Sequence, residues 1–459
     1  MEKAQLTQDE NLSIKISQRL LPKDNQRLDL YFSLPNEMGI DASTLTEQSY
    51  FFSSIKSHCA YYSAQLHLPL VRSRFISQKK GEQSDYRLNL NLFSYQIKIA
   101  LDRDIKQVIH ENDEATFYPQ AVEIAEQTIT LLKKLRRYSP PDSKLSPFFE
   151  NADNYLSWHI EQSFLRLLAV APQSSEFTTE RNFLLSLCKS ENDYRSKKRY
   201  NSQLTLNDPN RITNKMRLLQ RLIEYGVVFQ KKTRNLNTQL KRLVRGSVTA
   251  VIMSFVMVLV LNARTSFTEV TVALVALLGV IYGLREIFKE DVTRLIWRKI
   301  QQGLPKWQNV FIHSVTQTKI ATQTLWLEYI KKKQLPENVD KLFQKRRQQN
   351  KQAAQLLHFR SDTRVLAKEF LPGYDEIQQQ ITINLTPFVQ YLKKGEGRLY
   401  ALDEDNITNQ EVERRYQINL VLVRTDKDQL QHLQRFKITL NRSGIVNIEA
   451  MRLVQPTDV

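Results

Sequence analysis

Hydrophobic and polar positions along this chain follow different periods in successive stretches. Short runs alternate in residues 1–105, helical spacing of three and four dominates 106–245, and 246–284 is apolar almost throughout. Helical spacing returns over 285–375, and alternation returns over 376–459. The pattern predicts an α+β protein with an N-terminal β-rich region, a helical bundle, a pair of apolar helices, a second helical region and a C-terminal β-rich region.

Strict alternation marks the expected strands of the N-terminal region. It occurs at Leu12–Ile16, Leu28–Phe32, Tyr86–Leu92 and Tyr95–Ile99, and a change of phase near Phe93 indicates a bulge or a second strand. Every second side chain of a strand points to the same face. These runs therefore predict an antiparallel sheet with one packed face and one wet face.

The C-terminal region has the same character. Alternating runs occupy Ile381–Leu385, Tyr416–Leu422, Phe436–Leu440 and Ile445–Ile448. The last two flank Asn441–Gly444, whose Asn and Gly favour a hairpin turn. If both β regions lie in one compartment they can join in one composite domain, which the sequence leaves as a hypothesis.

Helices are expected between the first β region and the apolar stretch. Three cover Pro119–Arg137, Asn154–Val170 and Thr179–Tyr200. A fourth begins with Asp208 as its N-cap and Pro209 in its first turn. Its apolar stripe predicts the core of a bundle, with a coiled-coil dimer seam as the alternative. This helix is expected to run on, with or without a bend, into the first apolar helix.

Two apolar segments, Gly246–Ala263 and Phe267–Leu284, are neighbours in the middle of the chain. A helix of about 18 residues spans roughly 27 Å, close to the thickness of the hydrocarbon layer of a bilayer. The first segment has no charge, and the one charge of the second, Glu269, lies beside the short connection Arg264–Ser266. We expect a two-helix transmembrane hairpin, with a pair of buried helices in a soluble protein as the alternative.

Basic residues flank both apolar segments and set the expected orientation. Residues 231–245 hold six bases and no acid, whereas the connection holds only Arg264. The positive-inside rule then predicts a cytoplasmic helical bundle, cytoplasmic β regions and termini, and an external loop, in the inner membrane if the source is bacterial. The residues expected to contact anionic lipid headgroups are Lys241, Arg242, Arg245, Arg285, Lys289, Arg294, Arg298 and Lys299.

Small residues predict how the two apolar helices touch, because they recur every four positions on the first helix and form a GxxxG motif on the second. They are Gly246, Ala250, Ser254, Ala276, Gly279 and Gly283. In an antiparallel hairpin they fall at matching depths, where small side chains let two backbones approach closely in lipid. Packing within the hairpin is the favoured interpretation, and a homodimer of two hairpins through the same face is the alternative.

Beyond the hairpin, residues 285–302 predict an amphipathic helix that ends at Gly303 and Pro305. Its apolar face and its bases suit either the headgroup layer of a membrane or a stalk packed on the fourth helix, and the sequence leaves both open. Two more helices are expected over 313–335 and 336–359. The second is rich in Lys and Arg, which favours a solvated face, with contact to lipid or nucleic acid as the alternative.

Composition adds a strong positive charge to this picture. The 459 residues include 66 Lys and Arg against 48 Asp and Glu, and the net charge of +18 favours an anionic partner such as a lipid bilayer or nucleic acid. The two cysteines, Cys59 and Cys188, form no CxxC motif, so neither a disulfide scaffold nor a cysteine-ligated zinc is expected. No signal peptide is evident, so insertion is expected to depend on the internal segments.

Linear catalytic motifs are missing from the sequence. The 11 glycines form neither a Walker A nor a Rossmann motif, the 7 histidines show no HExxH or HxH spacing, and no GxSxG occurs. Acids at Asp102–Asp104 and His110–Glu114 are expected to be solvated, with a divalent-cation site as the alternative. No catalytic residue, cofactor or metal is therefore predicted.

These observations favour a non-enzymatic protein, a membrane-tethered scaffold or sensor whose cytoplasmic domains bind another macromolecule. A protein is the expected partner. A membrane-associated enzyme of an unrecognised class is the second hypothesis. A nucleic-acid-binding membrane protein is the third, and it requires a basic groove away from the bilayer.

Overall fold

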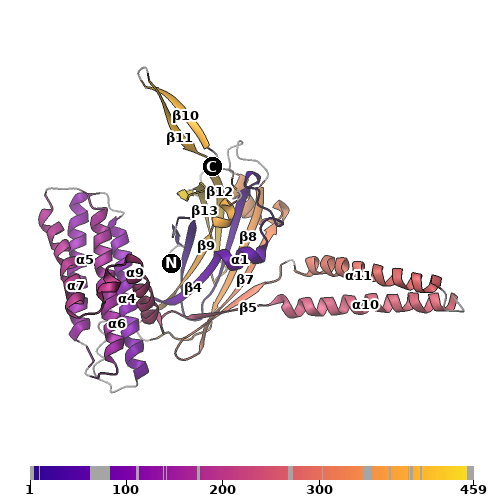
Figure 1. The fold of residues 1–459 in the computed structure, drawn as a ribbon, viewed down its shortest axis with the longest axis horizontal. Helices are drawn as coiled ribbons and strands as arrows, with labels where there is room; N and C mark the ends of the chain where they lie inside the picture. The colour runs from indigo at the N-terminus through magenta and orange to yellow at the C-terminus, as the bar shows by residue number, and fades with distance from the viewer. Residues whose placement is uncertain are drawn as a thin grey trace.

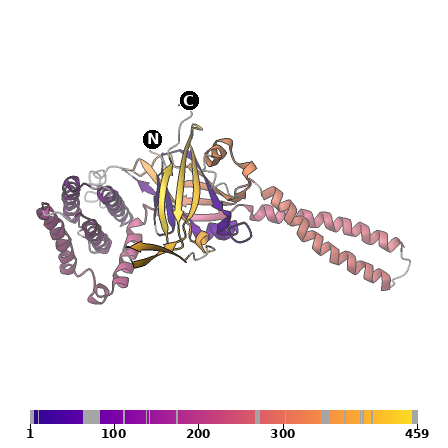
Figure 2. The same ribbon diagram turned by 90° about the horizontal axis from the view of Figure 1, so that it is seen from above.

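The computed structural model of the chain combines helices and sheets in three connected parts (Figure 1). It describes residues 5–9, 11–62, 83–109, 113–137, 139–140, 142–172, 176–266, 272–301, 303–344, 354–371, 374–390, 392, 396–403 and 406–451. Figure 2 shows a helical bundle at one end, a β-sandwich in the middle and a pair of long helices that projects from the other side. The mixture of helix and sheet expected from the sequence is confirmed.

Two antiparallel sheets enclose the core of the sandwich. The smaller sheet has the order β1 (Gln5–Gln8), β2 (Ser13–Leu20), β9 (Glu376–Asn384) and β4 (Ile55–Tyr62). The larger sheet has the order β14 (Ile445–Met451), β13 (Gln431–Leu440), β12 (Tyr416–Thr425), β3 (Asn25–Pro35), β8 (Ala354–Val365), β7 (Lys319–Ile330), β6 (Trp307–Ile312) and β5 (Gln230–Asn235). Strands from both ends of the chain pair within each sheet, so the composite domain is confirmed.

One layer of this sandwich core is polar. Buried amides of Gln18 and Gln379 bond to each other at 2.5 Å, and Gln379 donates to Thr363 at 3.0 Å. Further along, Asn309 donates to the side-chain oxygen of Gln323 at 2.8 Å. Because a buried amide that loses its partner costs about 1–3 kcal/mol, this layer disfavours any slip of the strands past one another.

The bundle follows β4 in the chain. Its helices are α4 (Gln83–Ile109), α5 (Glu114–Arg137), α6 (Ser146–Ala169), α7 (Thr178–Lys197), the short α8 (Gln203–Leu206) and α9 (Pro209–Glu224). The three helices predicted before Asp208 are confirmed as α5, α6 and α7. The Asp208 carboxylate caps α9 by accepting from the N–H groups of Asn210 at 2.8 Å and Arg211 at 3.2 Å, as predicted. The apolar stripe of α9 lies in the bundle core, as expected.

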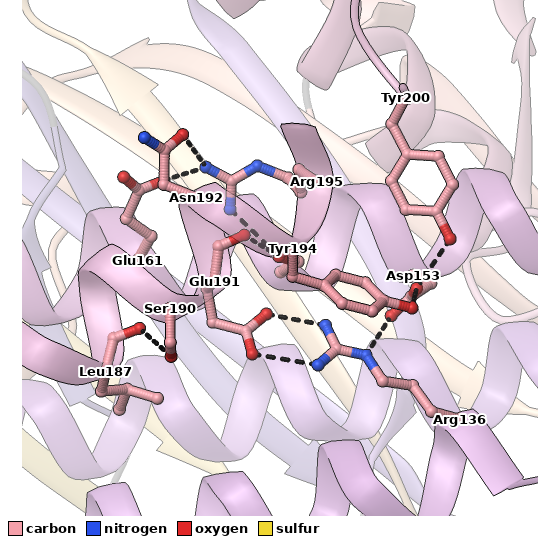
Figure 3. Close-up of polar contacts among 11 residues, drawn as sticks. Arg136, Asp153, Glu161, Leu187, Ser190, Glu191, Asn192, Tyr194, Arg195 and Tyr200 are labelled. Atoms are coloured by element: carbon pink, nitrogen blue, oxygen red, sulfur yellow. Dashed lines mark hydrogen bonds and ion pairs between the residues drawn. The ribbon is translucent and has the colours of Figure 1, made fainter. Parts of the chain in front are cut away.

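An ionic network is buried between α5, α6 and α7 (Figure 3). The Arg136 guanidinium donates to Asp153 at 3.0 Å and to the two oxygens of Glu191 at 3.0 and 2.7 Å. Asp153 also accepts from the hydroxyls of Tyr194 at 2.8 Å and Tyr200 at 2.9 Å. Burial and the nearby Asp153 charge raise the pKa of Tyr194 to about 12, so its hydroxyl remains a donor. Each buried charge thus has a partner.

The strands predicted within Tyr86–Ile99 are wrong, because the whole segment belongs to α4. This helix is buried on two sides. Leu90 and Phe93 contact the bundle core, whereas Leu92 and Tyr95 contact the sandwich core. Two apolar faces on one helix produce an alternating pattern that resembles a strand.

The helix predicted over 285–302 is confirmed as the second half of α11 (Val272–Gln301), whereas the two helices predicted over 313–335 and 336–359 are largely wrong. Residues 313–335 contain β7, in which Ala321, Gln323 and Leu325 are fully buried on the inner face. In the range 336–359, α12 (Glu337–Gln344) covers the start and β8 the end. The basic run after Gln344 lies outside the described residues. Alternating threonines in β7 favour a strand over a helix.

Helix α9 does not continue into the first long helix, contrary to expectation. It ends at Tyr225, which is extended, and Gly226 follows with φ +89°. A Cβ at Gly226 would lie 2.6 Å from Leu88 Cδ1, so both the space and the backbone favour glycine. The chain then forms β5 before the next helix begins.

Short helices and turns between the strands contribute side chains to the sandwich core. Helix α1 (Glu47–Ser54) and α13 (Thr386–Val389) contribute Tyr50 and Phe388, which stack at 4.9 Å within the core. Within the described ranges, 3-10 turns occur at Asn36–Met38 and Lys332–Gln334. A ribbon of β10 (Glu396–Asp403) and β11 (Asn406–Glu413) stands away from the sandwich (Figure 1).

Replacement of Arg136 tests the ionic network of the bundle. Arg136→Leu leaves Asp153 and Glu191 buried without their cation, and we expect a loss of about 3–5 kcal/mol in unfolding free energy. Urea denaturation of the full chain, followed by circular dichroism, measures the loss. The matched control is Arg137→Leu at the exposed neighbour, with an expected change within about 0.5 kcal/mol. Equal effects at the two positions would contradict this account.

Candidate functional site

The two long helices extend the β5–β6 strand pair. Helix α10 (Asn237–Ser266) begins directly after β5, and α11 (Val272–Gln301) leads back to β6. The ladder runs on beyond the last strand pair, because the Leu236 N–H donates to the Lys306 carbonyl at 3.0 Å. The edge of the sheet therefore holds the first turn of α10 and the last turn of α11 side by side. From there the pair projects away from the sandwich (Figure 2).

The outer part of this helix pair exposes apolar side chains. The exposed fraction is 70% at Val251, 65% at Phe255 and 88% at Val272. Among the described residues one segment, Asn237–Asn262, is long and apolar enough to cross a membrane, and 11% of its apolar window is buried. The start of the second predicted apolar segment, 267–271, lies outside the described residues.

Branched aliphatic residues form the seam between the two helices. On α10, Val248 and Val256 are buried, and Val244, Ile252 and Val260 are half-buried, which gives one contact every four residues. These positions differ by two residues from the small residues of the predicted seam. Two residues turn a helix by about 200°, so the seam lies on the opposite face of α10.

The small residues predicted to pack together are all exposed. They are Gly246, Ala250, Ser254, Ala276, Gly279 and Gly283. A Cβ built on any of the three glycines would meet no atom within 4 Å. The described hairpin therefore does not bring the two sets together, and its bulkier side chains set the distance between the helices.

A basic cavity lies where the helices leave the sheet. Its volume is about 410 Å³, and α1, the start of α10, the end of α11 and the start of β6 enclose it. The bases that line it are Lys241, Arg242, Arg245 and Lys306, and the aromatic residues are Trp297 and Trp307. We call it the inner cavity.

A second cavity of about 310 Å³, the outer cavity, lies between α10 and α11. It shares Lys241, Arg245 and Trp297 with the inner cavity and adds Lys289 and Arg294 together with the acid Glu290. Because they share these residues, the two cavities are neighbours along the helix pair, and we refer to them together as the basic groove.

Most of the residues predicted to contact headgroups line this groove. Those that do are Lys241, Arg242, Arg245, Lys289 and Arg294. Arg285 is half-buried, is not part of either lining, and has its guanidinium carbon 5.7 Å from the centre of the Tyr282 ring. Lys299 is exposed and is not part of either lining, and the side chain of Arg298 lies outside the described residues.

Positive charge in the groove is only partly balanced. Four bases have no ion pair within the described part of the chain: Lys241, Arg242, Arg245 and Arg294. Lys289 pairs with Glu286 at 3.2 Å. Lys306 is buried, and its ammonium binds the Glu47 carboxylate and the Leu327 carbonyl, the latter at 2.7 Å. The acid that lines the inner cavity is therefore already used by the protein.

Sequence reasoning missed the part of the groove that comes from outside the hairpin. Glu47 lies on α1, almost 200 positions before α10, and no local pattern connects the two. Lys306 and Trp307 directly follow the predicted break at Gly303–Pro305. A basic residue and a tryptophan at the point where an amphipathic helix ends are the signal that could have found them.

Helix α11 also answers part of the question about the amphipathic segment. The stalk interpretation predicts that this segment packs on the fourth helix, α9. The segment packs on α10 instead. Its apolar residues Phe288, Leu295 and Ile296 remain exposed. An apolar face beside a basic groove is typical of a helix that lies at a membrane surface.

A second charged cluster lies on the larger sheet and joins three strands. His358 Nε2 is 2.8 Å from Asp29, its Nδ1 is 3.6 Å from Glu328, and its ring stacks on Tyr31 at 4.4 Å. Burial alone would lower the pKa of His358. Hydrogen bonds and charges from the two carboxylates outweigh burial, so the pKa lies above its ordinary value.

Neither a metal site nor a relative is found. No group of three or more His, Cys, Asp or Glu side chains in the described residues is arranged to hold a metal ion. Asp102, from the acidic run considered as a cation site, lies in α4 and pairs with Lys98 at 3.1 Å and His159 at 3.0 Å. The chain matches no protein-family model, no curated protein and no solved structure.

Raising the pH is expected to weaken the fold through His358. A folded-state pKa above the ordinary 6.5 means that the stabilisation is fully present below that value and is lost as the pH rises through the folded pKa. His358→Gln should flatten the fall in unfolding free energy as the pH rises above the ordinary pKa of 6.5. Urea denaturation at each pH measures the unfolding free energy of the two proteins.

The control is the exposed His432, which lies 3.3 Å from Asp426. His432→Gln should keep the wild-type slope of stability against pH. A wild-type slope in His358→Gln as well would show that the cluster does not carry the effect.

Proposed function

We propose that the chain is a membrane-anchored scaffold, with α10 and α11 as a transmembrane hairpin and with the bundle and the sandwich together in the cytoplasm. The exposed apolar surface of the two helices carries this proposal. Burial of that surface in lipid contributes about 25 cal/mol per Å² of area removed from water. A helix also satisfies its own backbone hydrogen bonds, as the hydrocarbon layer requires.

Strand pairing supports an even number of crossings. β5 precedes α10, β6 follows α11, and the two strands are neighbours in one sheet. A chain that leaves this sheet and crosses a bilayer must therefore cross back before β6. Only α11 and the short links around it are available for the return.

Lengths and charges support the same orientation. Each helix has 30 residues, or about 45 Å, against 40–45 Å for a bilayer with its headgroup layers. The basic groove at the base of the pair then lies at the cytoplasmic headgroup layer, as the positive-inside rule predicts. Each base near an anionic surface contributes about 1 kcal/mol to attraction.

The ribbon β10–β11 is the surface that we assign to a protein partner. Within the described residues its two strands pair only with each other. Leu402 and Ile407 are opposite one another and each is 76% exposed, and Tyr400 beside them is also exposed. A two-stranded ribbon is marginally stable alone, and its free edges and apolar side chains favour contact with another protein.

Carbonate extraction tests the hairpin. The wild-type chain should stay in carbonate-washed membranes. Val251→Arg combined with Phe255→Arg and Val258→Arg should release most of it, because each arginine costs about 2.5–3.5 kcal/mol at the centre of a membrane helix.

The matched control places the same three arginines at exposed leucines of the bundle: Leu204, Leu218 and Leu222. This variant should remain in the membrane fraction. Release of the wild-type chain by carbonate would contradict the anchor.

A photo-crosslinking amino acid at Tyr400 tests the ribbon. In membranes it should give a discrete adduct with another protein, and Leu402→Asn with Ile407→Asn should abolish it by removing the apolar contact. Leu430→Asn, at an exposed leucine outside the ribbon, should leave the adduct unchanged. No adduct, or one that survives the double substitution, would contradict the assignment.

A further inference from the structure

The inner cavity has an excess of positive charge that the protein does not balance. Lys241, Arg242 and Arg245 lie close together on α10 and have no ion pair in the described chain. The fourth base, Lys306, is neutralised by Glu47, which also accepts the Tyr329 N–H at 3.2 Å. Four bases less one acid leave an excess of three charges. An anion of high charge density would balance it.

The start of α10 adds uncharged donors to the same cavity. Asn237 and Thr238 line it and are the first residues of the helix, where N–H groups have no acceptor within the helix. The Asn237 N–H donates to Asn235 Oδ1 at 3.3 Å, which leaves the Thr238 N–H and the Asn237 side chain as the donors at this end. Asn237 Nδ2 is buried, and no acceptor for it lies among the described residues. This donor is therefore available to an acceptor oxygen of a ligand. The positive end of the helix dipole also favours an anion at this point.

Two tryptophans give the cavity fixed walls. Trp307 is 3% exposed and stacks on Phe51 with ring centres 3.9 Å apart, so its position is set by the sandwich core. Trp297 comes from α11 and lines both the inner and the outer cavity. A volume of about 410 Å³ lies in the usual range of about 300–1,000 Å³ for small-molecule sites.

We propose that the inner cavity binds a phosphate monoester, and that the source of the monoester is the headgroup of an anionic membrane lipid. This rests on the proposed function, because the hairpin would bring the cavity to the headgroup layer. A monoester carries about −1.5 to −2 charges at pH 7 and offers three acceptor oxygens, which suits three unpaired bases and the donors of Asn237 and α10. A phosphodiester offers a single charge and fits less well.

The lipid source follows from what lies next to the cavity. The outer cavity extends the groove toward the apolar part of the hairpin, with Lys289 and Arg294 along the way. Further along the pair, the exposed side chains of α10 are apolar, among them Val251, Met253 and Phe255. An acyl chain attached to the bound phosphate would meet apolar surface there, whereas a free phosphate compound would gain nothing from it.

Calorimetric titration of the full chain in a neutral detergent tests the site. The probes are dioctanoyl phosphatidic acid, dioctanoyl phosphatidylglycerol and glycerol 3-phosphate. We expect one saturable site for phosphatidic acid, with binding at least about tenfold weaker for each of the other two. Arg242→Gln with Arg245→Gln should weaken phosphatidic acid about tenfold or more, and Arg242→Lys with Arg245→Lys should keep most of the affinity.

The matched control is Arg217→Gln with Arg221→Gln, which removes the same charge from exposed positions of α9. It should bind phosphatidic acid like the wild type. An equal loss of affinity for phosphatidic acid in the control variant would show that only the net charge of the chain matters, and it would overturn the site. Equal binding of phosphatidylglycerol would overturn the preference for a monoester. Equal binding of glycerol 3-phosphate would overturn the lipid source.

Failure of this inference and failure of the anchor can be told apart. A chain that resists carbonate but binds none of the three probes keeps the proposed function and loses the phosphate site. A chain that carbonate releases, and that binds glycerol 3-phosphate as well as phosphatidic acid, loses both the anchor and the lipid source.

Discussion

The antiparallel pairing of β5 with β6 is the contact on which the arrangement of this protein depends. One residue separates β5 from α10, and the hydrogen-bond ladder runs on through Leu236 and Lys306. The pairing therefore fixes the distance between the bases of α10 and α11 and makes them antiparallel. It also brings Lys306 and Trp307 of the sheet beside Lys241 and Arg242 of the helix, which creates the inner cavity.

The two sheets of the sandwich join strands from both ends of the sequence in one fold, so in the proposed topology these distant parts lie on one side of the membrane. β2 pairs with β9, and β3 lies between β12 and β8, so the sandwich needs both ends of the sequence. The bundle is an insertion between β4 and β5, and the hairpin is an insertion between β5 and β6. The polar layer around Gln379 and Gln323 holds these strands in register. A helical hairpin inserted at one edge of such a sheet leaves the pairing of the other strands unchanged.

Local sequence signals predict helices and strands well where each element packs against a single core and its hydrogen bonds are local. Asp208 as an N-cap and the turn at Asn441–Gly444 were predicted because their backbone bonds are local. Helix α4 was mistaken for strands because it is buried in two cores at once. The predicted contact face of α10 differs from the one in the structure. The small residues at matching depths predict the contact, whereas the valines on the opposite face of α10 form it. The groove could not be predicted in full, since Glu47 reaches it only through the folded sandwich.

The central claim is that α10 and α11 cross the membrane and leave the bundle and the sandwich on one side. Cysteine accessibility tests this claim most directly. Both natural cysteines, Cys59 and Cys188, are buried. Single cysteines at Thr265, at Lys189 of the bundle and at Lys332 of the sandwich are treated with a membrane-impermeant maleimide in intact cells. The account predicts labelling at Thr265 alone, and labelling at the other two only after permeabilisation. Labelling of all three in intact cells, or of none before permeabilisation, would contradict it.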